Sequence, residues 1–497
     1  MTKASTNTYI SLLFSLSLAL TCGIFLYSAN SPLGPSYGSD NAIYMTMGTA
    51  LAHGYRPYVD IFDHKGPVLF LLQWFPQCLG NGYQTLPIFM QEILFLFLCL
   101  RVLSLIARNI FHRYEIIIQL VYLCFISSLV SEGNLTEEYS NLFILIALFA
   151  IFKFLNTSSF HDNKTVMLTS LVIGLCFSIC FLIRANNALP LAGFILGILV
   201  TFLFSHEYHT IGLAAIGFLS GCLIVCIPIG LWLIANQALS ESIQASIIHN
   251  FLYSETTSIY TAGRLNQLLF SNYGHMALFF FSICFLASIL YFFKNHSTAL
   301  SLGIFFSGGF ALIAAFISHK YYDHYLIIGA PLSTLSAIYL LSQLKGNHSK
   351  VAIAVCLIPC IAWLAFQCLL ANTRRLSDNK NLSQFLSDTD SLISQIPVDE
   401  LSQVYPYRVE PKLYVAAHIL PYNRYYFLQE ILAEANPAIM DEIVNSFNTS
   451  PPLWLILFSK DRAFSPPYDT RIQEIIDTQY EECAEAGTYR LLRLSCQ

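Results

Sequence analysis

About eleven long apolar stretches are the feature that most limits what this chain can fold into. A helix needs about 20 apolar residues to cross a lipid bilayer, and most of the stretches approach that length. They lie near residues 9–28, 86–107, 115–131, 140–155, 166–183, 188–204, 211–234, 275–293, 299–317, 325–343 and 351–371. Only 11% of the 497 residues are charged, whereas a soluble chain has about 25%. The sequence therefore predicts a polytopic α-helical membrane protein, because a membrane β-barrel would have short alternating segments instead.

Basic residues in the short loops indicate how the helices are oriented, because loops rich in Lys and Arg stay in the cytoplasm. With Lys3 placed inside, the inner loops hold Arg108, Arg113, Lys153, Lys164, Lys294, Lys345 and Lys350. The outer loops are then 29–85, 132–139, 184–187, 235–274 and 318–324. With about eleven spans, the C-terminal region is expected outside the cytoplasm.

After the last apolar stretch the composition becomes polar, with Pro, Asp, Glu and Ser throughout. The expected strands are QVYPY, RYYFL, PLWLILFS and YRLLRLS, and the expected helices are EILAEANPAIMDEIVNSF and TRIQEIIDTQYEEC. Alternation of this kind is typical of a small α/β domain. The chain is therefore divided into a transmembrane domain, 1–371, and an extracytoplasmic domain, 372–497.

The first outer loop, 29–85, follows directly on the first span and contains Asp40, Asp60, Asp63, His64 and Lys65. Its expected helix covers residues 40–52, because Ser39 is a good helix cap and Gly54 a good helix stop. One face of that helix carries Ala42, Met45, Thr49 and Ala52, which suits a helix lying along a membrane surface.

Two further segments are expected at the membrane surface. Residues 67–79 are apolar but too short to cross, so they are interpreted as an interfacial or re-entrant piece. In the outer loop 235–274, Ile243, Ile247 and Phe251 recur at helical spacing, which predicts a second surface-lying helix.

Four clusters of ionisable and polar residues face the outer side under this topology. They are Asp40 with Asp60, Asp63, His64 and Lys65; Glu132, Glu137 and Glu138; Arg184; and His319, Lys320, Tyr322, Asp323 and His324. A charged group at membrane depth is costly and usually functional, whereas at the edge of a loop its cost is small. The functional signal is therefore the combination of acids and cations on one side of the membrane.

Each cluster also has a structural interpretation. The alternatives are a helix cap for Asp40, a solvated ion pair for Asp63 and Lys65, ordinary loop positions for Glu137 and Glu138, and a snorkelling side chain for Arg184. The two histidines of the last cluster have a spacing that metal ligands can have. No complementary Cys or His cluster accompanies them in the sequence, so a metal site is not expected.

Three sequence elements together resemble those of a known superfamily. The first outer loop begins with GSDNAIYMTMGTALAHGYRPY, in which Asp40 precedes a helix. It continues with FDHKGPVLFLL, in which Lys65 precedes an apolar run, and a later loop reads SHKYYDHYLIIGAP, with Lys320 and Tyr325. The pattern resembles the C-type glycosyltransferase superfamily, and within it the protein O-mannosyltransferase and lipid A aminoarabinose transferase branch. That family often has two adjacent acids at the first position, whereas here Asn41 follows Asp40.

The resemblance implies transfer of one sugar from a polyprenyl-phosphate donor to an acceptor hydroxyl on the extracytoplasmic face, with inversion. It implies Asp40 as the base and Lys65, Arg184 and Lys320 as cations for the donor phosphate. Further substrate-binding residues are Asp63, His64, Glu137, Tyr322, His324 and Tyr325. No metal ion or other cofactor is expected, because a monophosphate donor lessens the need for a divalent cation.

The implied partners are the lipid-linked donor, membrane lipids, and a lipid, polysaccharide or protein acceptor, in a bacterial inner membrane. The net charge of −5 gives no indication of nucleic-acid binding. Two other classes of protein remain open. One is a transporter or flippase of a lipid-linked sugar, although the spans have little central charge and no symmetry between halves. The other is a non-catalytic membrane accessory of envelope polysaccharide assembly.

Overall fold

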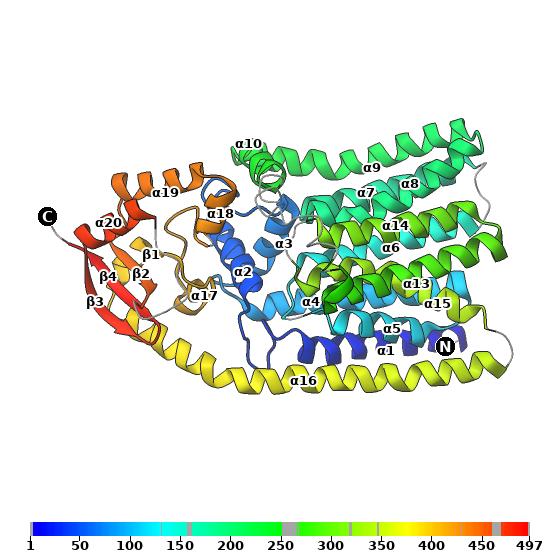
Figure 1. The fold of residues 1–497 in the computed structure, drawn as a ribbon, viewed down its shortest axis with the longest axis horizontal. Coiled ribbons are helices and arrows are strands. Elements are labelled where there is room, and N and C mark those ends of the chain that lie inside the picture. The colour runs from blue at the N-terminus through cyan, green and yellow to red at the C-terminus, as the bar shows by residue number, and fades with distance from the viewer. Residues whose placement is uncertain are drawn as a thin grey trace. The chain divides into compact units, whose positions relative to one another are not determined.

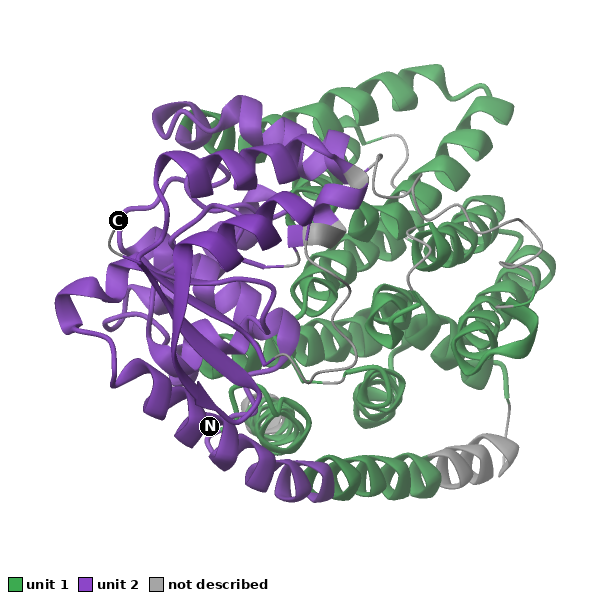
Figure 2. Cartoon of the chain, turned by 60° about the vertical axis from the view of Figure 1, so that its left-hand side comes forward, with its two compact units in different colours: residues 1–31, 89–231, 258–372 green, residues 32–88, 232–257, 373–497 purple. Residues whose placement is uncertain are grey.

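The structure, a computed structural model, describes residues 3–130, 132–156, 162–250, 266, 268–317, 321–344, 347–427, 429–459 and 469–495. The chain divides into two compact units, which have different colours in Figure 2. The bundle unit comprises Met1–Ser31, Phe89–Leu231 and Ser258–Asn372, and the sheet unit comprises Pro32–Ile88, Trp232–Thr257 and Thr373–Gln497.

The bundle unit is built from long apolar helices, which run side by side in Figure 1. They are α1 (Lys3–Leu26), α4 (Thr85–Ile106, continued by the π-helical turn Ala107–Phe111), α5 (Glu115–Ser127), α6 (Thr136–Asn156), α7 (Asn163–Ile183), α8 (Leu189–Phe204), α9 (Tyr208–Ala235), α13 (Asn272–Asn295), α14 (Thr298–Phe316), α15 (Ala330–Ser342) and part of α16 (Asn347–Ile393). Among the described residues, 10 helices are long and apolar enough to cross a membrane, and α5 is shorter, at 13 residues. The predicted polytopic helical fold is confirmed.

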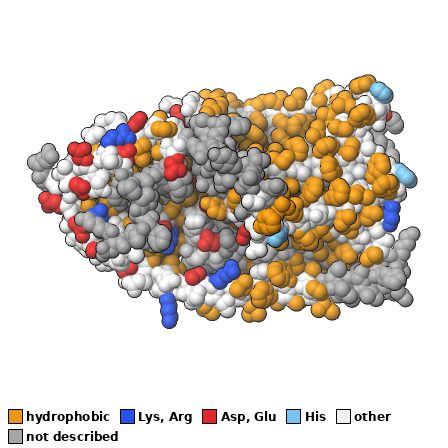
Figure 3. Space-filling view, viewed as in Figure 1, with side chains coloured by type: hydrophobic (Ala, Val, Ile, Leu, Met, Phe, Trp, Pro, Cys, Tyr) orange, Lys and Arg blue, Asp and Glu red, His pale blue; other side chains and the backbone are white. Residues whose placement is uncertain are grey.

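The outer surface of the bundle helices is apolar. Along α9, exposed side chains recur every three or four residues, at Ile216, Leu219, Leu223, Ile227 and Leu231. Hydrophobic side chains cover the long helices in the face shown in Figure 3. A helix satisfies its own backbone hydrogen bonds, so such a surface can contact hydrocarbon directly. The chain is therefore an integral membrane protein.

The helices α8 and α14 approach each other almost backbone to backbone. A methyl group on Gly193 would press on the carbonyl oxygen of Phe306, and one on Gly197 would overlap the backbone of Gly303. Between membrane helices, close packing takes the place of a hydrophobic driving force, and small residues make it possible.

The sheet unit contains a four-stranded sheet with the strand order β1-β2-β4-β3. Its strands are β1 (Val404–Pro406), β2 (Trp454–Phe458), β3 (Tyr480–Ala486) and β4 (Tyr489–Leu494). Strand β2 pairs in parallel with β1, and β4 pairs antiparallel with β2 and β3. The helices of this C-terminal region are α17 (Lys412–Ala417), α18 (Gln429–Ala435), α19 (Ala438–Thr449) and α20 (Thr470–Gln479). The predicted small α/β region is confirmed.

Two details of that prediction are wrong. Residues 424–427, part of RYYFL, form no strand. Their aromatic rings are buried instead, and the Tyr426 hydroxyl donates to the carbonyl of Ile43, 3.0 Å away. The expected helix ending in YEEC stops at Gln479, and Tyr480 starts strand β3. Pairing with β4 over most of its length outweighs the local helical pattern in that segment.

The first outer loop folds within the sheet unit as α2 (Ser39–Ala52) and α3 (Pro67–Gln77). The bounds of α2 agree with the predicted helix, but Asn41–Leu51 are all buried. The expectation of a helix with one buried face lying along a membrane surface is therefore wrong. Both α3 and α17 pack against it, and Gly48 lets α2 approach the backbone of Gln73 closely. At 11 residues, α3 is too short to cross a bilayer, as expected.

The second amphipathic segment forms α10 (Leu239–Ile243) and a π-helical turn, Gln244–Ile248. Ile243 and Ile247 are exposed, whereas Ala245 and His249 are buried. The apolar stripe found in the sequence therefore faces outward, as a helix at a membrane surface requires. Phe251 lies outside the described residues.

The last apolar stretch, expected at 351–371, is the first part of a much longer helix. Helix α16 has 47 residues, and the boundary between the two units falls inside it, after Asn372. The helix continues because the polar residues that follow contain neither Gly nor Pro before it ends at Ile393.

Candidate functional site

The loop between α2 and α3 carries the first predicted cluster, within the sheet unit. It starts where Gly54, at φ 88°, turns the chain out of α2. Four residues apart, Arg56 and Asp60 then form a two-pronged pair: the guanidinium Nη2 is 2.7 Å from Oδ1, and Nε is 2.9 Å from Oδ2. Hydrogen bonding to Arg56 lowers the pKa of Asp60, so the carboxylate is charged and closes the turn.

Asp63 and Tyr58 fix the position of Lys65. The Asp63 side chain is fully buried, and its Oδ1 accepts a 2.7 Å hydrogen bond from the backbone N–H of Lys65. The Tyr58 hydroxyl donates to the Lys65 carbonyl at 2.8 Å, and burial raises the pKa of that tyrosine, which keeps it a donor. Both backbone groups of Lys65 are therefore held, so its position does not depend on its own side chain.

The ammonium of Lys65 makes a hydrogen bond to a histidine and lies near an aromatic ring. Its Nζ is 2.9 Å from Nε2 of His64 and 3.8 Å from Oδ1 of Asp63. It also lies 5.9 Å from the ring centre of Tyr44, on α2. An ammonium can donate to Nε2 only if His64 is neutral with its proton on Nδ1, the nitrogen that faces Asp63 at 3.8 Å.

Asp40 lies one helical turn before Tyr44, in the first turn of α2. Side chains four residues apart share a helix face, so Asp40 is on the face of α2 where the Lys65 ammonium lies. Asp40 is half-buried, at the N-terminal end of the helix. The structure therefore combines an acid and a cation along one face of α2.

Asn41 shows why a second adjacent acid does not fit here. Its side chain is 1% exposed, and its amide Nδ2 donates to the carbonyl of Tyr37 at 2.8 Å and lies 3.2 Å from the sulfur of Met45. An ionised carboxylate has no proton to donate and would repel the carbonyl. At this position the sequence departs from the resembled pattern, and the local structure requires a donor.

Two residues that the sequence analysis did not single out complete this cluster. Asn250 donates its side-chain amide to the carbonyl of His64 at 2.8 Å, and the ring centre of His249 is 6.2 Å from that of His64. Burial, and then the nearby charge of Lys65, lowers the pKa of His249, so it is neutral at pH 7. Both residues belong to the amphipathic segment that contains Ile243 and Ile247, and its polar residues could have indicated them.

An open polar cleft of about 610 Å³ is lined in part by the same loop, within the sheet unit. Its walls include Tyr55, Asp60, Asn423 and Arg424. The Arg424 carbonyl accepts from the N–H of Phe62 at 2.9 Å, which joins the cleft to the segment that leads to Lys65. Hydrogen-bonding groups next to a tyrosine ring are a suitable lining for a polyhydroxylated ligand.

The bundle unit has its own charged cluster at the start of α6 and the end of α7. Arg184 Nη1 lies 2.6 Å from Oε1 of Glu137, which is 2% exposed and also accepts from the Thr136 hydroxyl at 2.9 Å. The guanidinium stacks over the ring of Tyr325 at 4.1 Å. His324 contacts Tyr325 edge-on, with ring centres 4.7 Å apart.

The predicted residues thus fall into two groups. The sheet unit contains Asp40, Asp63, His64 and Lys65, and the bundle unit contains Glu137, Arg184, Tyr322, His324 and Tyr325. Lys320 lies outside the described residues. Across the described part of the chain, no group of three or more His, Cys, Asp or Glu residues is arranged to hold a metal ion.

No protein-family model matches the chain, and no curated protein sequence matches it significantly. Solved structures do resemble it. ArnT from Cupriavidus metallidurans, bound to undecaprenyl phosphate, superposes with a TM-score of 0.63 over 98% of this chain and 99% of its own, at 12% identity. The Archaeoglobus fulgidus oligosaccharyltransferase in its apo form superposes with a TM-score of 0.53 over 90% of this chain and 69% of its own, also at 12% identity. Likeness at such low identity is a likeness of fold, and by that measure this chain has the fold of the C-type glycosyltransferases.

Proposed function

We propose that the protein is a membrane glycosyltransferase that moves a sugar from a polyprenyl-phosphate donor to an acceptor hydroxyl. The observation that carries the proposal is the placement of Lys65 over Tyr44, one turn from Asp40, in a chain with this fold. The similar ArnT structure holds undecaprenyl phosphate, which supports a polyprenyl phosphate as the lipid partner.

The proposed chemistry is a single displacement at the anomeric carbon. The acceptor oxygen forms a bond to that carbon and gives its proton to the Asp40 carboxylate, while the bond from carbon to phosphate oxygen breaks. The electron pair leaves with the polyprenyl phosphate, whose negative charge increases by one. Lys65 stabilises that charge, and attack opposite the leaving group inverts the anomeric centre.

The remaining residues have supporting roles in this proposal. Asp63 and His64 position Lys65, and the polar cleft beside Asp60 receives a hydroxyl-rich acceptor. Arg184, with Glu137 and the aromatic residues Tyr322, His324 and Tyr325, keeps within the bundle unit the donor-binding role that the resemblance implies. The reaction takes place on the extracytoplasmic face of a bacterial inner membrane, and the C-terminal α/β region lies on that side.

The experiment begins with a strain that lacks the gene, because mass spectrometry of its envelope glycans and polyprenyl phosphates identifies the missing sugar and the accumulated donor. That donor, radiolabelled in the sugar, is then given to the purified protein in nanodiscs. We expect Asp40→Asn to lower turnover by about 10²- to 10⁴-fold while binding of undecaprenyl phosphate is unchanged. Near-normal turnover of this variant would remove Asp40 as the base. In liposomes, movement of intact donor across the bilayer without cleavage would replace transfer by transport.

A further inference from the structure

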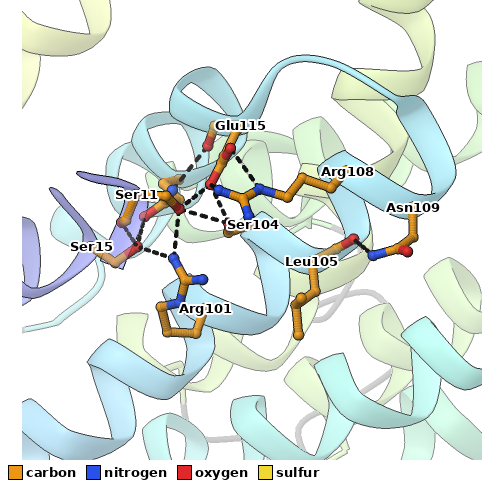
Figure 4. Close-up of polar contacts among 9 residues, drawn as sticks. Ser11, Ser15, Arg101, Ser104, Leu105, Arg108, Asn109 and Glu115 are labelled. Atoms are coloured by element: carbon orange, nitrogen blue, oxygen red, sulfur yellow. Dashed lines mark hydrogen bonds and ion pairs between the residues drawn. The ribbon is translucent and has the colours of Figure 1, made fainter. Parts of the chain in front are cut away.

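A polar cluster that contains none of the predicted site residues lies among the helices of the bundle unit (Figure 4). It joins the start of α1, the end of α4 and the start of α5. Glu115 accepts two hydrogen bonds from Arg108, at 2.9 and 2.8 Å, and two more from the hydroxyls of Ser11 and Ser104. Both oxygens of the Glu115 carboxylate therefore accept hydrogen bonds, and Arg108 balances its negative charge.

Arg101 adds a second positive charge to this cluster. Its Nη1 donates to the hydroxyls of Ser11 at 2.7 Å and Ser15 at 3.3 Å, as Figure 4 shows. Within the described residues, no salt bridge involves Arg101, and its Nε and Nη2 donate to no protein group. The cluster therefore carries a net charge of one positive unit, with one edge of a guanidinium left open.

The depth of Arg101 makes that open charge costly. The helix that begins with α4 has 27 residues and ends at Phe111, so it is about 40 Å long and Arg101 lies about 15 Å from that end. Its side chain extends toward the end, to the level of Ser104, which is about 10 Å from it. A hydrocarbon core about 30 Å thick, centred on this helix, starts about 5 Å inside each end. The guanidinium then lies about 5 Å below the hydrocarbon boundary, where an unbalanced charge is unfavourable.

The surroundings of Arg101 are open to the outside of the bundle and apolar. Arg101 is half-buried, Leu105, one turn further along α4, is 39% exposed, and Leu12, on α1, is 40% exposed. Leu105 lies at about the level of the guanidinium, so the surface beside the open edge includes an apolar side chain that a lipid can contact.

We propose that Arg101 binds the phosphate of an anionic phospholipid. The Nε–Nη2 edge of a guanidinium presents two parallel N–H groups that match two phosphate oxygens. A lipid phosphate is at the boundary already and reaches the guanidinium by moving a few ångströms inward. A free phosphate ion would have to leave water to reach the same depth. The proposed site is independent of glycosyl transfer and would remain if that function were disproved.

The test is native mass spectrometry of the full-length protein released from nanodiscs that contain either phosphatidylglycerol or phosphatidylcholine with the same acyl chains. We expect the wild type to retain phosphatidylglycerol and Arg101→Gln to retain at least tenfold less. Arg101→Lys should fall between them, because an ammonium keeps the charge but not the two-pronged geometry.

Two further variants separate lipid binding from folding. Arg113→Gln removes the same charge at the same end of the bundle, from a guanidinium that stacks on Tyr114 and donates to the Ser342 carbonyl, and should retain the lipid like the wild type. Glu115→Gln disturbs the cluster but increases its positive charge, so it should retain at least as much lipid as the wild type.

Three results would overturn the proposal. They are equal retention by Arg101→Gln and the wild type, equal retention of the two lipids, and loss of lipid in Glu115→Gln as great as in Arg101→Gln. Displacement of the lipid by excess inorganic phosphate would assign the site to a free anion instead.

Discussion

Lys65 in the sheet unit and Arg184 in the bundle unit are both cations predicted to bind a phosphate, yet they are held in opposite ways. The Lys65 ammonium is 3.8 Å from the nearest carboxylate oxygen, and the protein fixes the residue through its backbone N–H and carbonyl. The Arg184 guanidinium is 2.6 Å from a buried carboxylate and is stacked on a ring.

This difference separates a cation available for a ligand from one engaged in the fold. A cation held through its backbone can exchange its weak side-chain contacts for a phosphate at little cost. A cation in a buried, short ion pair can bind a ligand only by sharing or losing a partner that would then be buried unpaired. Of the two, Lys65 is therefore better placed to interact with the leaving group, and Arg184 to hold α6 and α7 together.

The largest effect that tests this contrast is on stability. Arg184→Gln leaves the Glu137 carboxylate buried without its cation, so we expect a loss of about 3–5 kcal/mol in the free energy of unfolding. The measurement is unfolding in detergent micelles, followed by circular dichroism. The double variant Arg184→Gln/Glu137→Gln should recover part of the loss, because it removes both charges. A single variant as stable as the wild type would mean that the pair does not hold the bundle.

The next effect is on turnover. Lys65→Gln should reduce transfer by about 10²- to 10³-fold, the usual consequence of losing one group that stabilises developing charge. Its unfolding free energy should fall by less than that of Arg184→Gln, because the backbone contacts of residue 65 do not use the side chain and its ammonium is 3.8 Å from the buried carboxylate, against 2.6 Å for Arg184. The opposite pattern, normal turnover with low stability, would reverse the assignment of the two cations.

A smaller effect is expected at Asn41, which supports the α2 face shared by Asp40 and Tyr44. Asn41→Asp replaces a buried donor with an acceptor facing the Tyr37 carbonyl, and should cost about 1–3 kcal/mol. The same unfolding measurement checks it, with Asn41→Ser as a control that keeps a donor. A stable and more active Asn41→Asp variant would show that two adjacent acids are tolerated here after all.

The smallest effect concerns pH. Burial lowers the pKa of His249, so the unfolded chain binds a proton more readily than the folded one once the pH falls below about 6.5. Stability contributed by neutral His249 is therefore complete above that pH and is lost on acidification. His249→Gln should flatten the decline in stability between pH 7 and pH 5. An unchanged decline would assign it to other groups.

Much of the fold follows from local sequence signals. Gly54 ends α2 as predicted, whereas Ser39 is the first residue of the helix and not its cap, which is Gly38. Strand β2 is a short apolar run between polar residues. The errors come from partners distant in the sequence. The Tyr426 hydroxyl donates to the backbone carbonyl of Ile43, 383 residues away in the sequence. The local sequence around Tyr426 cannot indicate a partner so distant.

The sequence indicated those site residues that are neighbours in the chain, but not the residues that folding brings beside them. Asp63 and Lys65 are two residues apart, and the carboxylate that fixes the lysine backbone is local in sequence. His249 and Asn250 come from a segment about 185 residues later, and only folding places them beside His64. The pairing of Arg184 with Glu137 was also invisible, because it joins the ends of two different helices.

The contact between α8 and α14 limits how this membrane region can move. At Gly193 and Gly197 there is no room even for a methyl group, so these two helices cannot move closer together and can slide past each other only if they first separate. We therefore expect conformational changes in the bundle to occur between other pairs of helices, with α8 and α14 moving as one body. Gly197→Ala, which adds one carbon at this contact, would test how much the proposed activity depends on the close packing of α8 and α14.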